Sequence, residues 1–273
     1  MTESSLQPFL KWPGGKRWFV ERFRGSFAVE YQMYIEPFVG SGAVFFELRP
    51  DRARLGDTNE ELISTYQAIT RDWKAVWDRL RRHQCQHSDS YYYRIRASRP
   101  RSAAGRASRF IYLNRTCFNG MYRVNLRGEF NVPRGTKNSV IMDNDDFRRV
   151  AHRLTKCKFY LADFETLVKR ARRNDLIYLD PPYTVKHNNN NFIKYNEHLF
   201  SWADQQRLAA ALKEADRRGA TFVLSNADHI SIRKLYNGFA TIKRVSRASV
   251  LAADKSKRRT TTELVISNMH LAL

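Results

Sequence analysis

Cysteine is scarce in this chain, whose 273 residues include only Cys85, Cys117 and Cys157. Because these three are widely spaced and form no Cys-x-x-Cys pair, the sequence predicts neither a disulfide framework nor a zinc site. The chain also lacks a long apolar run, and its first residues lack the apolar core of a signal peptide, which favours a cytoplasmic location. The sequence Gly-x-x-x-x-Gly-Lys-Ser/Thr is absent as well, so triphosphate binding is not expected.

Acidic residues are outnumbered by basic ones. The sequence has 48 Lys and Arg against 27 Asp and Glu, which gives a formal charge of +21 and a pI near 10.2. Residues 71–109 alone hold eleven basic and three acidic residues, a local surplus that suits contacts with phosphates. We therefore expect a polyanionic partner, although a generally basic soluble protein would show the same total.

Short apolar or alternating runs recur along the chain and predict strands at 34–39, 52–56, 158–162, 175–179, 221–225, 241–247 and 263–267. Helical patterns fall between several of them, at 43–49, 164–172 and 202–218. This alternation predicts an α/β fold, a mostly parallel sheet with helices on both faces. Because residues 60–150 interrupt the alternation with an arginine-rich, aromatic and locally helical stretch, we expect an inserted domain there, within a discontinuous α/β domain formed by 1–59 and 151–273.

Asp180-Pro181-Pro182-Tyr183 directly follows the apolar run 176–179. The two prolines prevent that strand from continuing, so a carboxylate, a rigid turn and an aromatic ring project from its C-terminal end, where open α/β sheets bind ligands. Asp180 and the Pro181 carbonyl can accept from an exocyclic amino group, Tyr183 offers a face to a planar base, and this chemistry needs no metal. The alternative is that the motif only ends a strand.

A second turn at a strand end contains Gly40 and Gly42, which let the backbone turn tightly and approach a ligand. About fifteen residues further on, the run 53–57 reads as the next strand and ends in Asp57, an acid placed to accept from ribose hydroxyls. A glycine turn followed by an acid, without a further phosphate-binding loop, favours a nucleoside cofactor that carries no phosphates.

Four separated motifs resemble those of the S-adenosylmethionine-dependent DNA adenine-N6 methyltransferases of the Dam family. They are Phe9-Leu10-Lys11-Trp12-Pro13-Gly14-Gly15-Lys16, the turn from Glu36 to Gly42, the stretch Leu113-Asn114-Arg115 with Phe118 to Pro133, and Asp180-Pro181-Pro182-Tyr183. The resemblance covers most of residues 9–268. It implies a Rossmann-like catalytic domain (1–59 and 151–273) that binds S-adenosylmethionine, a recognition domain with a β-hairpin (60–150), double-stranded DNA as partner, and a monomer in solution.

The same resemblance implies roles for individual residues. The catalytic set is Asp180, Pro181, Pro182 and Tyr183. The cofactor-binding set is Trp12, Lys16, Phe38, Gly40, Gly42, Asp57, Asp163, Phe164 and Asp180. Within it, Asp163 and Phe164 hold the adenine of the cofactor, through a carboxylate and a neighbouring backbone N–H. For Trp12 a core position is an equal alternative, whereas Lys16 follows two glycines and would have little to pack against.

The implied DNA-binding set is Lys11, Phe118, Asn119, Met121, Arg123, Asn125 and Pro133. Arg123 would read a guanine through O6 and N7, and Phe118, which stands where a tyrosine is expected, would wedge into the base stack. Plain phosphate contact is the preferred reading for Arg127 and Arg134, and a basic DNA-facing edge is expected at Arg247 with 255–259. The similarity of 119–133 to enzymes that methylate GATC predicts that site, with longer sites containing GAT as the alternative.

Two rival functions remain open at this point. One is the same chemistry on RNA or on another DNA site, because the Asp180 motif selects a planar amino group rather than a polymer. The other is a DNA-binding relative that has lost catalysis, although the intact motifs count against it.

Overall fold

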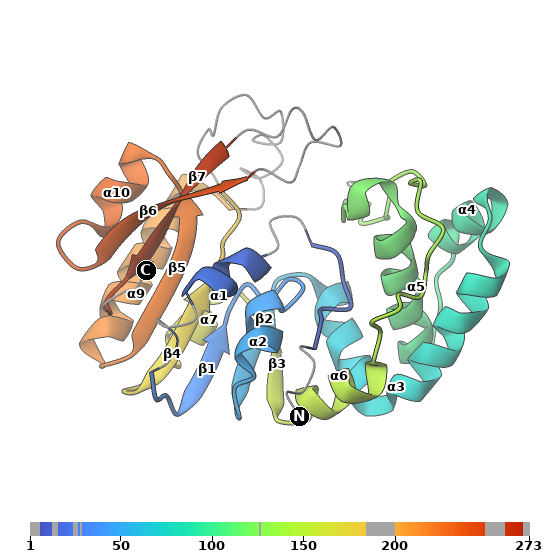
Figure 1. The fold of residues 1–273 in the computed structure, drawn as a ribbon, viewed down its shortest axis with the longest axis horizontal. Coiled ribbons are helices and arrows are strands. Elements are labelled where there is room, and N and C mark those ends of the chain that lie inside the picture. Colours follow the sequence, from blue (N-terminus) through green and yellow to red (C-terminus); the bar gives the residue numbers. More distant parts are fainter. Residues whose placement is uncertain are drawn as a thin grey trace. The chain divides into compact units, whose positions relative to one another are not determined.

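A computed structural model describes residues 6–12, 16–23, 27, 29–125, 127–183, 200–248 and 260–269. Its strands form one seven-stranded sheet in the order β3-β2-β1-β4-β5-β7-β6 (Figure 1). The strands are β1 (Met33–Glu36), β2 (Ala53–Asp57), β3 (Cys157–Leu161), β4 (Asp175–Leu179), β5 (Thr221–Ala227), β6 (Thr241–Ala248) and β7 (Thr260–Ser267). The mostly parallel α/β sheet that the sequence predicted is confirmed.

Among the pairs around β5, strand β7 is the one that runs against its neighbours. Strand β4 pairs in parallel with both β1 and β5, and β7 then pairs antiparallel with both β5 and β6. All five residues of β4 are buried, as expected for a central strand covered on both faces. Because β1, β4 and β5 run the same way, their carboxyl ends meet at one edge of the sheet.

The helices are α1 (Arg17–Phe23), α2 (Ala43–Leu48), α3 (Glu60–Gln86), α4 (Asp89–Ala97), α5 (Ala103–Thr116), the 3-10 turn η2 (Phe118–Gly120), α6 (Phe147–Leu154), α7 (Phe164–Val168), α9 (Trp202–Arg217) and α10 (Ile230–Tyr236). Helix α9 begins with a capping box, in which Ser201 and Asp204 bond each other's backbone N–H. Helix α7 is shorter than the pattern at 164–172 predicted, and it ends at Val168.

The chain divides into two compact units. One comprises 1–22, 39–51 and 55–161, and the other comprises 23–38, 52–54 and 162–273. In the first unit α3 packs on α5 and α6, and a fully buried Arg115 on α5 joins distant segments. In the second, α7 packs against α9 and β1, and α9 packs against β5. The division into 1–59 with 151–273 and an insertion at 60–150 remains a prediction.

Candidate active site

Asp180-Pro181-Pro182-Tyr183 begins directly after β4 ends at Leu179. Leu179 lies opposite Leu224 of β5, which brings Ser225 level with the start of the motif. On the other side of β4, Ile35 of β1 lies opposite Ile177, and the chain leaves β1 through Glu36. The motif therefore lies at the carboxyl edge of three parallel strands, the position where α/β sheets bind ligands.

The hydroxyl of Tyr183 is anchored on the neighbouring strand. It lies 3.0 Å from the Ser225 hydroxyl, and Ser225 donates to the Glu263 carboxylate at 3.4 Å. Either hydroxyl of the Tyr183–Ser225 pair can be the donor; when the single Ser225 proton is directed at Glu263, Tyr183 donates to Ser225. Glu263 is 2% exposed and belongs to β7. The tyrosine ring is thus oriented through β5 and β7.

Buried tyrosines and carboxylates crowd the same strand ends. Glu36 is 2% exposed and accepts a hydrogen bond of 2.9 Å from Tyr34. Burial, followed by the charges of Asp180 and Glu36, raises the pKa of Tyr178 well above its ordinary value. Tyr178 therefore stays neutral beside the carboxyl groups of Asp180 and Glu36.

The glycine turn belongs to the other compact unit and is held by Asp57. The backbone N–H of Gly40 donates to Asp57 at 3.3 Å, and the Tyr66 hydroxyl donates to the Gly40 carbonyl at 3.0 Å. Gly40 and Gly42 have φ of +46° and +68°, and a Cβ on Gly40 would lie 2.8 Å from the Trp12 ring, so glycine is required. Burial raises the pKa of Asp57, against the opposing effect of backbone hydrogen bonds.

Trp12 and Lys16 flank residues 13–15 of the N-terminal motif, which lie outside the described part of the chain. The Trp12 ring stacks on Tyr122 at a centroid distance of 6.3 Å and an angle of 19°, beside Gly40. Lys16 is 4% exposed, so the expectation that it has little to pack against is wrong. The roles predicted for both residues in cofactor binding remain predictions.

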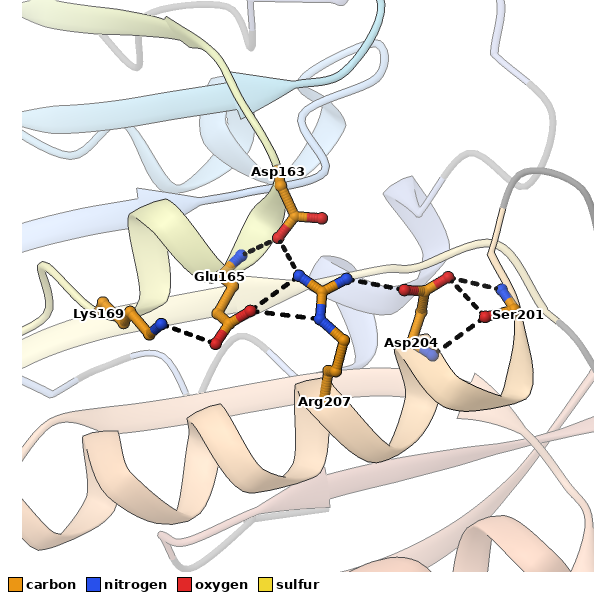
Figure 2. A network of polar contacts seen from close by, with 6 residues as sticks. All are labelled: Asp163, Glu165, Lys169, Ser201, Asp204 and Arg207. Atoms are coloured by element: carbon orange, nitrogen blue, oxygen red, sulfur yellow. Dashed lines mark hydrogen bonds and ion pairs between the residues drawn. The ribbon is translucent and has the colours of Figure 1, made fainter.

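Asp163 and Phe164 begin α7 (Figure 2). Asp163 accepts from the Glu165 backbone N–H at 2.9 Å and from the Arg207 guanidinium at 2.8 Å. The Phe164 ring stacks on Phe38 at 5.5 Å with an angle of 25° between the rings. The structure thus brings together three of the predicted cofactor residues, Phe38, Asp163 and Phe164.

The predicted recognition segment folds back on itself through two isolated antiparallel bridges, Cys117 with Arg134 and Val124 with Phe130; Leu126 is not described. Asn125 donates from its backbone to Glu129 at 2.9 Å, which closes the turn. Arg123 is exposed, and its Nε donates to Asn131 Oδ1 at 2.9 Å. Its guanidinium is therefore held on the hairpin rather than packed into the core.

The remaining predicted DNA-binding residues surround the start of this segment. Phe118 is 49% exposed, and its backbone N–H donates to the Pro133 carbonyl at 2.9 Å. Asn119 has a φ of +54°, and Met121, which ends the turn, is half-buried. Phe118 therefore presents an exposed aromatic ring on a tight turn, and its role as a wedge in the base stack remains a prediction.

Two basic residues have protein partners. Lys11 Nζ donates to the Arg115 carbonyl at 3.1 Å, and burial, followed by repulsion from Lys137 and Arg115, lowers the Lys11 pKa. Arg134 forms an ion pair of 2.6 Å with Asp89, whereas Arg127 is exposed. The basic edge predicted at 255–259 lies outside the described residues, as does the side chain of Arg247.

Sequence reasoning did not identify Tyr66, Ser225, Glu263 or Arg207, which hold the predicted site residues in place. Each comes from a different element and meets its partner across 26 to 44 residues of sequence. No local pattern marks such residues, because their contacts depend on strand order and helix packing.

Within the described ranges, no group of three or more His, Cys, Asp and Glu side chains is arranged to hold a metal ion. The same part of the chain contains no helix that is long and apolar enough to cross a membrane.

Comparison with known proteins indicates the same family as the sequence motifs. Residues 12–250 match the model of the D12 class N6 adenine-specific DNA methyltransferases. The chain is 35% identical to the Type II methyltransferase M1.LlaDCHI of Lactococcus lactis subsp. cremoris, over 97% of this chain and 96% of that protein. It is 33% identical to the Type II methyltransferase M.MjaIII of Methanocaldococcus jannaschii, over 96% and 99%.

A third relative, the DNA adenine methylase of Haemophilus influenzae, is 32% identical over 95% of this chain and 92% of its own length. The family model covers far more than half of the chain, and these relatives match it almost from end to end. The resemblance to the Dam family is thereby confirmed. The chain belongs to the D12 class N6 adenine-specific DNA methyltransferases and is an enzyme that methylates adenine in DNA.

Proposed function

We propose that this enzyme transfers a methyl group from S-adenosylmethionine to N6 of an adenine that has been rotated out of double-stranded DNA, within the sequence GATC. The observation that carries the proposal is the position of Asp180-Pro181-Pro182-Tyr183 at the carboxyl edge of β4, with the Tyr183 hydroxyl anchored on Ser225. We further propose that the protein acts as a monomer in the cytoplasm.

The cofactor subsites would be divided among the residues already described. Gly40 and Gly42 would pass beside the methionine portion, Asp57 would accept from the ribose hydroxyls, and Asp163 would accept from the adenine amino group. Trp12, Lys16, Phe38 and Phe164 would complete the subsites. When bound, S-adenosylmethionine supplies an electrophilic methyl group on a sulfonium ion.

Two observations support the fit of this cofactor. Both protein contacts of Asp163 use Oδ1, so that, among the described residues, Oδ2 is open to a ligand N–H. The ends of β1 and β4 carry the carboxyl groups of Glu36 and Asp180, and acidic groups at this position would attract a cationic donor rather than an anionic one.

At the target base, Asp180 and the Pro181 carbonyl would accept the two N–H bonds of the adenine amino group. That group is a weak nucleophile because its lone pair is delocalised into the ring, and two acceptors would localise the pair on nitrogen. Tyr183 would replace the base stack that the adenine loses on rotating out of the duplex. Alignment of this kind can contribute roughly 7–11 kcal/mol in well-oriented reactions.

Asp180 need not be a strong base, because the amino proton becomes acidic only after the methyl group has been transferred. Pro182 would keep the turn rigid, since proline fixes φ and cannot extend the strand.

The recognition domain would read the DNA through Arg123, with Lys11, Phe118, Asn119, Met121, Asn125 and Pro133 around it. A guanidinium can donate to guanine O6 and N7 at the same time. In the major groove, guanine is the base that presents such a pair of acceptors. Arg127 would contribute a phosphate contact, and such contacts supply affinity without sequence preference.

Substitution of Tyr183 separates the roles of its ring and its hydroxyl. Tyr183→Phe keeps the ring and loses one hydrogen bond, so we expect kcat to fall by about 2- to 10-fold. Tyr183→Ala also loses base stacking, which should cost a further factor of about 5 to 150. Ser225→Ala removes the anchor together with the hydrogen bond to the buried Glu263, so its loss should be at least as large as that of Tyr183→Phe. Single-turnover rates with saturating DNA measure all three, and equal losses for Phe and Ala would show that the hydroxyl, not the ring, matters.

Substitution of Arg123 tests the sequence that is read. Arg123→Ala should lower discrimination at one guanine by about 1–3 kcal/mol, or about 5- to 150-fold. Arg127→Ala is the matched control on the same hairpin; it should weaken binding equally on all sequences and reduce the salt slope by about 1. Competition binding with GATC duplexes and with duplexes altered at one guanine measures both effects.

Single-molecule sequencing of plasmid DNA tests the proposed function as a whole. The plasmid is taken from cells that express this protein and lack adenine methylation of their own. We expect N6-methyladenine at GATC sites. Methylation confined to a longer site containing GAT, or to another motif, would overturn the specificity and leave the chemistry standing. An unmethylated plasmid would contradict the proposal.

A further inference from the structure

Arg207, on α9, forms ion pairs with three carboxylates. The proposed chemistry gives this arginine no role. Its guanidinium donates to Asp163 Oδ1 at 2.8 Å, to Glu165 Oε2 at 2.8 Å and to Asp204 Oδ1 at 2.8 Å (Figure 2). Lys169 in turn pairs with the other oxygen of Glu165, also at 2.8 Å. The planar guanidinium suits this arrangement, because its donors point in fixed directions toward separate acceptors.

The two carboxylate oxygens of Asp163 differ in their contacts. Oδ1 accepts both the Glu165 backbone N–H, which begins α7, and the Arg207 guanidinium. Oδ2 has no partner within the described ranges, and Figure 2 shows it directed away from the network. The backbone contact alone leaves the carboxylate able to turn about its terminal bond. The second donor at Oδ1 fixes the direction in which Oδ2 points.

Arg207 also covers the residue that follows Asp163. Its guanidinium carbon lies 5.0 Å from the centroid of the Phe164 ring, and Phe164 in turn contacts the rings of Phe38 and Phe200, each at 5.5 Å. The ring is therefore held by a cation and two aromatic neighbours. One side chain on α9 thus restrains both Asp163 and Phe164.

These contacts contribute little to the stability of the fold. The Arg207 side chain is 43% exposed, and exposed ion pairs contribute only about 0–1 kcal/mol to folding. Helix α9 already has its capping box and a buried apolar face that includes Leu208 and Leu212. A network that adds little to stability yet fixes one open carboxylate oxygen serves whatever binds at that oxygen.

We infer that Arg207 is a positioning residue for the adenine of the methyl donor, acting through Asp163 and Phe164. The inference rests on the proposed function, which places that adenine at Asp163. Arg207 does not contact the donor itself. It sets the direction of Asp163 Oδ2 and the plane of the Phe164 ring before the donor binds. These side chains therefore lose less conformational entropy when the donor binds.

The test is the affinity for S-adenosylhomocysteine, the demethylated donor, measured by isothermal titration calorimetry on the full chain. Arg207→Ala should raise Kd by about 5- to 50-fold, the effect expected when a hydrogen bond to a charged group is partly lost. Arg207→Lys keeps the charge but cannot bridge three carboxylates, so it should restore only part of the affinity. DNA affinity and the melting temperature should stay at wild-type values.

Arg217→Ala is the matched control. Arg217 lies on the same helix, is exposed and pairs only with Glu214 in the described part of the chain, so its loss should leave Kd within twofold. A Kd for Arg207→Ala equally close to wild type would overturn the inference.

A double-mutant cycle separates this inference from the function on which it rests. Asp163→Asn keeps a good residue at the start of α7 and should itself weaken binding. If Arg207 acts through Asp163 and Phe164, the loss in the double variant is clearly smaller than the sum of the two single losses, and what remains beyond Asp163→Asn alone is the part that acts through Phe164. Additive losses would show that Arg207 acts by another route and would overturn the inference. An unchanged Kd for Asp163→Asn would instead remove the proposed adenine subsite, and the inference with it.

Discussion

Asp180→Ala is expected to abolish methyl transfer while DNA affinity stays within a few-fold of the wild type. Asp180 follows the fully buried strand β4, and the proposed chemistry has no second side chain to accept the amino proton. Loss of one preorganised contact at a reacting group costs about 100- to 1000-fold in kcat. Affinity should persist because phosphate contacts elsewhere supply most of it. Single-turnover rates and a DNA-binding titration on the same preparation measure the two quantities.

Removing a carboxylate from a basic protein also changes its charge, so this experiment needs a control of equal charge. Glu214→Ala removes an exposed carboxylate whose ion-pair partner is Arg217, and it should leave the transfer rate unchanged. Activity of Asp180→Ala within tenfold of the wild type would refute the assigned role.

Arg115→Ala should reduce the free energy of unfolding by about 3–5 kcal/mol, the cost of breaking a buried ion pair from one side. The Arg115 side chain is 0% exposed and pairs with Asp145 through two nitrogens, at 2.5 and 2.7 Å. It also donates to the carbonyls of Phe9 and Val140. One side chain thus joins the N-terminal segment, α5 and the segment before α6, and its removal leaves a charge and two carbonyls without their donor.

Urea denaturation of the purified protein measures this loss. Arg99→Ala is the matched control, because Arg99 forms an exposed ion pair with Glu129 in which the arginine is 78% exposed. That variant should lie within about 0.5 kcal/mol of the wild type. A loss below about 1 kcal/mol for Arg115→Ala would show that the buried pair does not hold these segments together.

The sequence predicted the part of the fold that local patterns determine. Strand β4 spans Asp175–Leu179, the same residues as the strand predicted at 175–179, whose apolar run two prolines bring to an end. The tight turn at Gly40 and Gly42 was predicted from the two glycines, and both residues have positive φ. Continuous apolar runs and residues with unusual backbone freedom leave a signal in a single sequence.

The residues that hold these motifs in place could not be predicted in the same way. Ser225 meets Tyr183 only because β5 lies beside β4, and Glu263 meets Ser225 only because β7 returns antiparallel beside β5. Lys16 is buried although its glycine neighbours suggested an exposed position. Such contacts follow from strand order and packing, which depend on the whole chain rather than on neighbouring residues.

Transfer of tritiated methyl groups from S-adenosylmethionine onto an unmethylated duplex with one GATC site is the most direct test of the central claim. The DNA is digested to nucleosides after reaction with the wild type or with Asp180→Ala. We expect label in N6-methyldeoxyadenosine for the wild type and background label for the variant. Label in another nucleoside, no label with the wild type, or equal label with Asp180→Ala would contradict it.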